Sequence, residues 1–463
     1  MSQQYKPCDR DQRFLLPPSM RDWLPPGDLA YFMIDVVEEL DLSEIYAYYD
    51  RDPKTGRAKA ASGQPAYHPK MMTALLLYAY ANGTPSARRI ARLCERDAGY
   101  RIVSADQQPD FRTISEFRRI HLKVLKGLFV QVLHLAREAG LVRLGHVALD
   151  GTKVKANASK HAAMSYERMQ ETEVRYEQEI ADLLRQAEET DIAEDARYGS
   201  ERRGDEVPKE LEFRQTRLVK IREAKAALEA AAKEKARAEG KLDENDKPIP
   251  PERGRPPETP PGIPKPTDQR NFTDPESRIM KMPSKAFDQA YNCQAAVDAD
   301  TQIIVAEDVT DAANDKEQVV PMVEQTDANL GETPKELSAD SGYYSEANVA
   351  ALRERGIDDY LCPDRMKHGD APAPVPSGRI PKDLSFTDRV RRKLRTKHGR
   401  AAYGLRKQTV EPVFGQIKHG RGLRQFLLRG IGKVRGEWSL WCTTHNLLKL
   451  WVAGQRVRVA GVG

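Results

Sequence analysis

The sequence has few cysteines, and their arrangement excludes a zinc site or a disulfide framework. The five in its 463 residues are Cys8, Cys94, Cys293, Cys362 and Cys442. None lies close to another, so the paired spacing of a zinc ligand set or a small disulfide-rich domain is missing. An odd number of scattered cysteines is typical of reduced, intracellular thiols.

Long apolar runs are also missing. No stretch approaches the ~20 apolar residues of a membrane-spanning helix, and the first residues contain no apolar core of a signal peptide. We therefore expect a cytoplasmic protein with no membrane association. Apolar residues still make up 40% of the chain, which is enough for two or three domains with real cores.

Acidic residues are nearly absent from one segment, residues 389–435. The net charge of the whole chain is only +5, but Glu411 is the only acid in this segment. Solvated helices usually mix both signs of charge, whereas a field of one sign attracts a phosphate backbone. The segment therefore predicts a polyanion-binding surface. Its basic residues are Arg389, Arg391, Arg392, Lys393, Arg395, Lys397, Arg400, Arg406, Lys407, Lys418, Arg421, Arg424, Arg429, Lys433 and Arg435.

The first 140 residues favour helices. Apolar residues recur at helical spacing over 29–40 and 70–81, and a long helix is expected from about 116 to 139. Thr113 or Ser115 could cap that long helix. Basic residues on these segments fit either a helical DNA-binding module or a plain helical bundle with a basic surface. They are Arg88, Arg89, Arg92, Arg118 and Arg119.

Short strands begin at His146. The run from His146 to Ala156 is apolar and alternating, which predicts a strand. Further strands, with helices between and after them, would complete a mixed α/β sheet, and the first two of these form a predicted hairpin. They are expected at 291–298, 302–309, 336–339 and 359–362.

A large insertion follows the first strand. Residues 165–239 are rich in Glu, Lys, Arg, Gln and Ala, which predicts exposed helices, arranged as a coiled-coil hairpin broken near 199–208. Residues 246–266 hold many prolines and predict a stiff linker. The expected domains are a helical N-terminal domain at 1–140, an α/β domain made of 141–164 and 267–452, and a helical, proline-rich insertion at 165–266.

Three carboxylates occupy positions where such a sheet carries chemistry. Asp150 comes at the end of the apolar part of the first predicted strand, and Asp340 comes at the end of another; reactive groups collect at strand ends in open α/β sheets. Glu411 stands alone among basic residues. Carboxylate oxygens are the ligands that Mg²⁺ prefers, and two such ions can activate an attacking hydroxyl and stabilise a leaving oxygen on phosphorus. The three residues are therefore candidates for a two-metal site.

Each of these carboxylates also has a plain structural explanation. Asp150 and Gly151 after a strand are a common turn pair. Asp340 could cap the next helix, and Glu411 could offset the repulsion between its basic neighbours. Taken singly, none of the three establishes a catalytic site.

Together, however, these segments resemble the DDE transposases of bacterial insertion sequences, which have an RNase H-like fold. HVALDGTKVKAN around Asp150 resembles the first catalytic strand of the family, and ADSGYY around Asp340 resembles its second aspartate motif. VEPVFGQIK around Glu411 resembles its glutamate helix. YNCQAAVD at 291–298 resembles its strand pair, and YHPKMM at 67–72 resembles its N-terminal helical domain. The resemblance covers about residues 10–452 and is weakest across the insertion.

The resemblance implies an α/β fold with an RNase H-like mixed sheet and flanking helices. It implies an enzyme that cleaves transposon-end DNA and joins the 3′-hydroxyl to target DNA by two-metal phosphoryl transfer. Asp150, Asp340 and Glu411 would bind Mg²⁺, for which Mn²⁺ substitutes. Because two DNA ends must meet, it also implies a homodimer on DNA, in the bacterial cytoplasm and associated with the nucleoid. An RNase H-like nuclease without strand transfer, or an inactive DNA-binding protein, is the alternative, and the presence of all three carboxylates disfavours the second.

The resemblance also assigns DNA contacts. Many relatives carry a Tyr, Arg, Glu, Lys signature around the glutamate, and Lys418 has the expected spacing from Glu411. Lys407 occupies the strict arginine position, whereas Tyr403 and Arg406 stand one place too early. The expected DNA-binding residues are Lys418, Tyr403, Arg406, Lys407, Arg421 and Arg424.

Pro412 directly follows Glu411 and bears on its backbone conformation. A residue before proline is disfavoured in the α region, and proline is favourable in the first turn of a helix but costly inside one. We therefore expect Glu411 at the start or at a kink of a helix that continues to Lys418.

Overall fold

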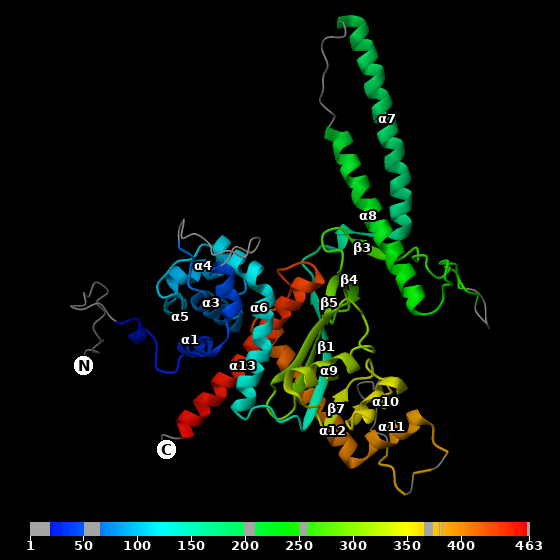
Figure 1. Cartoon of the computed structure of the whole chain (residues 1–463). Coiled ribbons are helices and arrows are strands. Elements are labelled where there is room, and N and C mark those ends of the chain that lie inside the picture. The colour runs from blue at the N-terminus through cyan, green and yellow to red at the C-terminus, as the bar shows by residue number, and fades with distance from the viewer. Residues whose placement is uncertain are drawn as a thin grey trace, which may run out of the picture.

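The computed structural model describes residues 19–50, 65–198, 209–250, 257–364, 374–378, 380–381 and 383–460, and the structural statements below concern these residues. Figure 1 shows a group of helices from the N-terminal region, a central sheet with flanking helices, and a helical arm that projects away from both. The sheet lies between the N-terminal helices and the arm (Figure 1).

Helices form the N-terminal part, as the sequence predicts. The long helix α6 (Phe111–Glu138) begins earlier than expected, because Asp110 caps it in place of Thr113 or Ser115. The Asp110 carboxylate accepts a hydrogen bond from the backbone N–H of Arg112 at 2.7 Å, and its charge also suits a helix N-terminus. The preceding elements are η1 (Met20–Asp22), α1 (Leu29–Glu39), α2 (Ser43–Asp50), α3 (Pro69–Ala81), α4 (Ala87–Arg96) and α5 (Ala98–Val103).

The central sheet has an antiparallel half and a parallel half that meet at β1 (His146–Lys155). β5 (Phe287–Asp298) is antiparallel to β1, and both β6 (Ile304–Thr310) and β4 (Arg278–Lys281) are antiparallel to β5. On the other side, β7 (Glu336–Ala339) is parallel to β1 and β8 (Asp358–Leu361) is parallel to β7. This strand order is RNase H-like, and the predicted mixed sheet is confirmed.

Helices from the second half of the chain cover this sheet. α12 (Lys397–Gly415) packs across β1, β5, β7 and β8 and is followed by one π-helical turn, η3 (Gln416–Gly420). α9 (Val319–Leu330) and α13 (Ile431–Ala460) both pack against β6. α10 (Glu346–Glu354) and α11 (Phe386–Arg395) both contact β8.

One hydrophobic core runs through the N-terminal helices and the sheet. α13 lies between them and contacts α3 and α6 as well as β6. Its Gly436 permits close approach to α6, because a β-carbon at that position would lie 2.6 Å from Cγ of Leu122. Met33, Trp438 and Val305 belong to the same cluster of buried residues. The hydrophobic core is therefore continuous across residue 140, where the sequence changes from a helical to a strand-like pattern.

The arm consists of two long helices, as predicted for this region. α7 (Tyr166–Tyr198) and α8 (Lys209–Ala238) pack against each other and extend away from the sheet (Figure 1). The short strands β2 (Ala163–Ser165) and β3 (Gln269–Asn271) pair antiparallel at its base, just after the turn η2 (Lys160–Ala162). The arm has only a small core of its own, made of Met169, Ile221 and Ala224. The predicted break at 199–208 lies outside the described residues.

Candidate active site

Asp150 lies in the interior of β1 and not at its end. The strand continues to Lys155, and Asp150 itself pairs with Ala295 of β5. The strand predicted from His146 to Ala156 is confirmed, whereas the placement of Asp150 at a strand end is wrong, and the pair Asp150–Gly151 is not a turn. Gly151 has a different use, because a β-carbon there would lie 2.7 Å from both Oδ1 of Asp315 and Nε2 of Gln294. The glycine makes room for a polar group beside Asp150.

Asp340 directly follows β7, as predicted, and is a neighbour of Asp150. The parallel register of β1 and β7 pairs Leu149 with Ala339, so the two aspartates occupy equivalent positions on adjacent strands. The Oδ1 of Asp340 accepts a hydrogen bond from the backbone N–H of Gly342 at 2.8 Å. Sequence order and sheet topology therefore bring together two residues that are far apart in the chain.

Glu411 is an exposed residue inside α12, close to the C-terminal end of that helix. Of the two expected positions, a helix start or a kink, the helix start is wrong, because the helix begins at Lys397 and contains Pro412. A proline inside a helix cannot donate to the carbonyl of the residue four positions earlier, here Gln408. The side chain of Gln302 compensates, since its Nε2 donates to this carbonyl at 3.0 Å. A tertiary hydrogen bond thus replaces the missing helical one.

Arg406, which the sequence predicts as a DNA contact, is bonded to Asp150. Its Nη1 lies 2.8 Å from Oδ2 of Asp150, and the two side chains are only 11% and 17% exposed. The guanidinium also lies over the ring of Tyr403, 5.8 Å from its centroid. In this structure both Arg406 and Tyr403 therefore belong to the surroundings of the carboxylates.

Burial dominates the electrostatics of Asp150. Desolvation raises the pKa of Asp150 to about 7, Arg406 opposes this shift, and the negative charges of Asp340 and Asp315 add to it. Burial also lowers the pKa of Arg406, but the nearby negative charges, led by Asp150, outweigh that effect and hold it above its usual value. The cluster therefore favours a positive group close to Asp150. We call Asp150, Asp340 and Asp315 the carboxylate site.

Lys418 is held against the same strand. Its Nζ donates to Oγ1 of Thr152 at 2.8 Å and to the carbonyl of Lys153 at 3.0 Å. Burial lowers the pKa of this ammonium group. The expected spacing after Glu411 therefore places a lysine beside β1, next to the carboxylate site.

Arg421 does not lie where the sequence predicts it, on a DNA-binding surface. It is buried, with Nη1 donating to Oγ1 of Thr444 at 2.7 Å and Nη2 to the carbonyl of Trp441 at 3.1 Å. Burial lowers its pKa to about 10. Lys407 and Arg424 are both exposed, and Arg424 contacts His419. The interpretation of Arg421 as a DNA contact is therefore corrected to a structural role.

Three residues of this region were missed by sequence reasoning. Asn292 and Gln294 are buried on β5, and both donate to Oδ1 of Asp315, at 2.7 and 2.8 Å. Gln294 in turn accepts a hydrogen bond from the hydroxyl of Tyr343. The available signal was the presence of two amides at alternate positions of an otherwise apolar strand. Asp315 itself stands in a polar loop and gives no such signal.

Two families match parts of the chain. Residues 379–451, which include α12 and Glu411, match a transposase DDE domain, and residues 18–119 match a transposase domain (DUF772). Both matches, together with the order of the carboxylates on the sheet, agree on one family. The two matches indicate an insertion-sequence DDE transposase. No curated protein and no solved structure gives a significant match.

Family membership implies that the transposase acts on DNA and depends on divalent metal. The donor chemistry of the carboxylate site fits such an ion, because hard divalent cations prefer carboxylate oxygens and Asp150 already requires a neutralising charge. Ligand atoms of Asp150, Asp340 and Glu411 do not all come within 4.8 Å of one another in the described structure. In this structure Arg406 forms an ion pair with Asp150. A cation bound to Asp150 would therefore take over part of the charge neutralisation that Arg406 provides.

Another group does satisfy that spacing, but it is held by ordinary ion pairs. Glu336, Asp358 and His398 lie at the opposite end of β7 and β8 from Asp340. His146 is paired with Glu336 at 2.8 Å, and Lys393 with Asp358 at 2.5 Å. These contacts explain the cluster without a metal ion.

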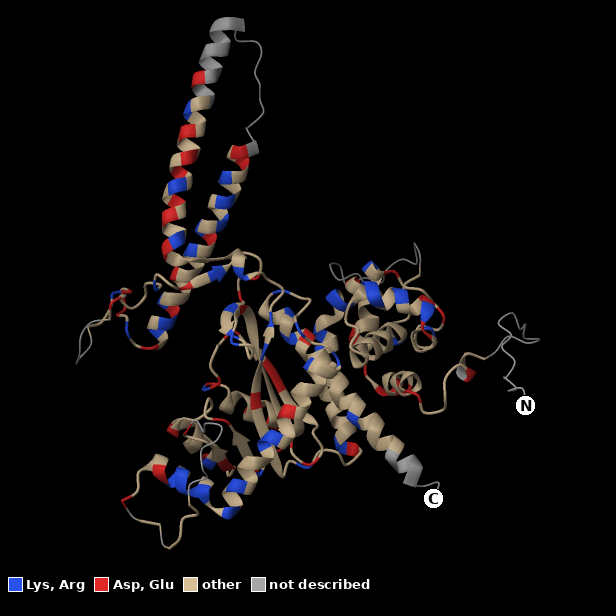
Figure 2. Cartoon of the chain, turned by 180° about the vertical axis from the view of Figure 1, so that it is seen from behind, with Lys and Arg blue, Asp and Glu red and all other residues tan. Residues whose placement is uncertain are grey.

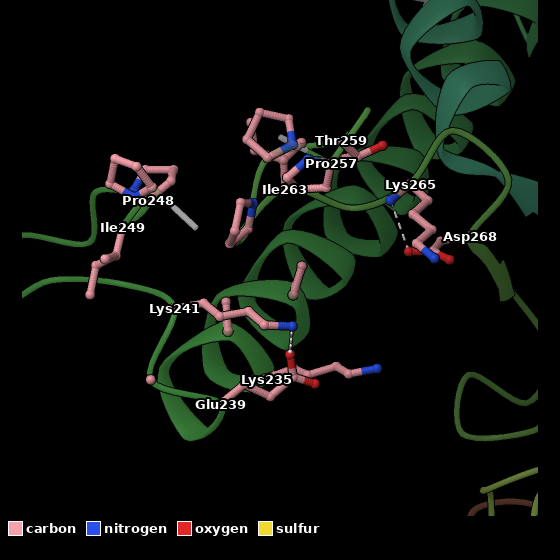
Figure 3. A pocket seen from close by; sticks show the side chains of 17 residues that line it. Lys235, Glu239, Lys241, Pro248, Ile249, Pro257, Thr259, Ile263, Lys265 and Asp268 are labelled. Carbon is pink, nitrogen blue, oxygen red and sulfur yellow. Dashed lines mark hydrogen bonds and ion pairs between the residues drawn. The ribbon is translucent and has the colours of Figure 1, made fainter. Parts of the chain in front are cut away.

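A cavity of about 930 Å³ lies in the arm and shares no residue with the carboxylate site. Figure 3 shows its lining from the end of α8 and the proline-rich segment, including Ile249 and Ile263. Two of its charged side chains, Lys241 and Glu239, form an ion pair with each other at 2.5 Å. The cavity and the carboxylate site are therefore separate features of the fold. No helix within the described ranges is both long enough and apolar enough to cross a membrane.

Proposed function

We propose that the transposase cleaves transposon-end DNA and joins the freed 3′-hydroxyl to target DNA by two-metal phosphoryl transfer. The register of β1 and β7, which makes Asp150 and Asp340 neighbours, carries this proposal. α12 packs across both strands and supplies Glu411. We propose these three residues as ligands of Mg²⁺, with Mn²⁺ as a substitute, because both ions suit carboxylate oxygens.

Phosphoryl transfer needs positioning and charge stabilisation more than covalent help from the protein. Bound divalent cations would supply an activated attacking hydroxyl and stabilise the leaving oxygen. Arg406 keeps Asp150 paired in a place where burial otherwise favours its protonated form. Lys418, fixed on Thr152 and Lys153, holds a further positive charge beside the strand, within reach of a phosphate backbone.

The basic segment 389–435 offers less free charge than its sequence indicates. Arg391 pairs with Asp364 and Asp388, and Arg435 pairs with Asp308. Arg406, Arg421 and Lys393 are engaged as described above. The fold therefore brings acids and carbonyls from outside the segment to many of its cations, and its remaining exposed charges, such as Lys407 and Arg424, are the better candidates for DNA contacts.

α4 offers a second basic surface, which supports the DNA-binding interpretation of the N-terminal helices. Figure 2 shows the basic residues of this helix, all of them arginines, gathered along it. Its arginines are exposed, and none has an ion-pair partner among the described residues. A cavity of about 490 Å³ lies beside it, and its lining includes Arg88, Arg112, Arg118 and Leu427. The arginines of the helix are Arg88, Arg89, Arg92 and Arg96.

The proposed function is tested by Asp150→Asn, Asp340→Asn and Glu411→Gln in the full-length protein. The substrate is labelled DNA carrying the inverted repeats that flank the gene, with Mg²⁺. Each variant should lose cleavage by a factor of hundreds or more while it retains end binding, the scale of removing a transition-state stabiliser. Substantial cutting by a variant would remove that residue from the ligand set.

The wild-type protein in the same assay separates the rival functions. Cleavage followed by joining to a target plasmid supports the transposase. Cleavage without joining supports a nuclease, and binding without cleavage supports an inactive DNA-binding protein.

We also propose that a homodimer forms on the DNA, because two ends must be held together, and that the protein, as a DNA-binding protein, associates with the nucleoid. Light scattering of the complex with end DNA measures the stoichiometry, and two bound ends on a single chain would contradict the dimer.

A further inference from the structure

Besides Asp150, Asp340 and Glu411, a further carboxylate belongs to this region: Asp315, in the loop between β6 and α9. This residue is partly buried, and two side-chain amides from β5 hold one of its oxygens. Asn292 Nδ2 lies 2.7 Å and Gln294 Nε2 lies 2.8 Å from Oδ1. No hydrogen bond to Oδ2 is found among the described residues. A carboxylate fixed in this way has a defined direction for its second oxygen.

Oδ2 of Asp315 and Oδ1 of Asp340 both lie close to Gly342. A β-carbon at Gly342 would lie 3.0 Å from Oδ1 of Asp340 and 3.4 Å from Oδ2 of Asp315. Gly151 shows a similar approach from β1, since its β-carbon would meet Oδ1 of Asp315 at 2.7 Å. A glycine on β1 and a glycine in the turn after β7 thus leave room for Asp315 beside Asp150 and Asp340.

Bringing a third aspartate to Asp150 and Asp340 is costly unless a cation offsets it. Like charges at such distances repel, and burial strengthens the repulsion. Arg406 neutralises Asp150, but no cationic side chain is bonded to Asp315 in the described chain. Among the described residues neither Asp315 nor Asp340 has an ion-pair partner, and Arg406, which pairs with Asp150, acts on Asp340 only at longer range.

We propose that Asp315 is a fourth carboxylate of the transposase, oriented by Asn292 and Gln294 so that its Oδ2 binds a divalent cation together with Asp340. This inference rests on the proposed function, which supplies the need for the cation. It adds Asp315 to the ligand set and assigns Asn292 and Gln294 as positioning residues. Groups that orient a metal ligand are usually worth about 10- to 100-fold in metal affinity.

The test measures Mn²⁺ binding directly, in the full chain without DNA, by electron paramagnetic resonance of free Mn²⁺. Asp315→Asn should weaken the tighter Mn²⁺ binding by about tenfold or more, and Asp315→Glu should recover part of it. Gln294→Ala, which keeps the charge of Asp315 but removes one of its anchors, should weaken binding by a smaller factor. Asp300→Asn is the matched control, because it removes an exposed aspartate on the far turn of the β5–β6 hairpin.

The outcomes distinguish this inference from the proposed function. If the wild type binds Mn²⁺ and Asp150→Asn loses it, while Asp315→Asn binds as the wild type does, Asp315 is not a ligand and the proposed function stands. If the wild type binds no Mn²⁺ and cuts no DNA, the proposed function itself is contradicted, and with it the assignment of Asp315. If Asp315→Asn does not fold, Gln294→Ala and Asp315→Glu decide, and unchanged affinity in both overturns the assignment.

Discussion

At the scale of single residues, burial decides what a charged side chain does in this transposase. Arg421 and Arg424 are both arginines of the basic segment, yet the first is enclosed by Thr444 and Trp441 and the second is exposed. A buried guanidinium stabilises the fold through its hydrogen bonds, whereas an exposed one is available to phosphates. The two positions therefore predict opposite phenotypes.

We expect Arg421→Ala to lower the free energy of unfolding by about 2–4 kcal/mol, because it removes two buried hydrogen bonds and leaves a cavity. Urea denaturation measures this change. Arg424→Ala is the matched control and should leave stability within about 0.5 kcal/mol of the wild type. Equal stability of both variants would contradict the buried role of Arg421.

DNA binding should follow the exposed arginines of α4. We expect Arg88→Ala combined with Arg92→Ala to reduce the slope of log affinity against log salt by up to ~2, because each lost phosphate contact reduces the slope by about one. Fluorescence anisotropy with end DNA at several salt concentrations measures the slope. Arg421→Ala should not change it in protein that remains folded. A slope that α4 substitutions leave intact would place the DNA on another surface.

Glu307 of β6 makes stability depend on pH. Burial raises its pKa from the ordinary 4.5 to about 8, with Lys126 opposing the shift. Between these two values the folded state keeps a proton that the unfolded state has lost, so the free energy of unfolding falls as pH rises from about 5 to 8. Glu307→Gln should make this decline shallower, while Glu354→Gln on the surface should not. Asp150 contributes a decline of the same sign, up to about pH 7. Chemical denaturation at several pH values measures the effect, and identical profiles for Glu307→Gln and the wild type would refute it.

At the scale of elements, α12 shows how tertiary contacts override local preference. Pro412 lies inside this helix, and Gln302 donates to the carbonyl of Gln408 that the proline leaves without a partner. Gln302 belongs to the β5–β6 turn, so the compensation comes from another part of the fold. The helix can then carry Glu411 across β1 and β7.

A double-mutant cycle tests this compensation. Gln302→Ala should cost about 1 kcal/mol of stability in the wild type, because a helical carbonyl loses its partner. The same substitution should cost less in the Pro412→Ala background, where the replacement restores a backbone N–H that can donate to the carbonyl of Gln408. The coupling energy from thermal or urea unfolding is the measured quantity. A coupling of zero would mean that Gln302 acts elsewhere.

Much of the sheet could be predicted from the sequence, because alternating apolar residues report burial directly. The resemblance to DDE transposases implied a common metal site for Asp150 and Asp340, and the register of β1 and β7 makes the two residues neighbours. Position within a strand was not predictable, since Gly151 locally resembles a turn residue and only Asp315, far along the chain, explains it. The fate of the basic segment was not predictable either, because its acidic partners come from other segments. Such partnerships depend on tertiary structure and leave no local pattern.

At the scale of the whole molecule, the arm is attached by a narrow base. β2 and β3 pair at this base, and the backbone N–H of Tyr166 donates to the carbonyl of Asp268 at 2.8 Å. The chain therefore enters and leaves the arm at nearly the same place. A surface insertion closed in this way costs the rest of the fold little entropy.

We expect a protein in which a short Gly/Ser linker replaces residues 168–262 to fold. Only the small cluster of Met169, Ile221 and Ala224 is lost, and the main core is untouched. Circular dichroism should show less helix in proportion to the deletion, with a cooperative thermal transition within a few degrees of the wild type. Insoluble or non-cooperative protein would show that the arm is required for folding.

The central place of β1 has a consequence for synthesis on the ribosome. β1 ends at Lys155, and the strands on its two sides, β5 and β7, begin only at Phe287 and Glu336. At about 5–20 residues per second, the nascent chain carries this apolar strand without neighbours for on the order of ten seconds. During that interval α7 and α8 can already pair, because their contacts are local. β1, the strand that bears Asp150, is thus the part of the sheet that stays without partners for the longest time. When elongation is slowed or chaperones are scarce, we expect the nascent transposase to aggregate through β1 before the carboxylates come together.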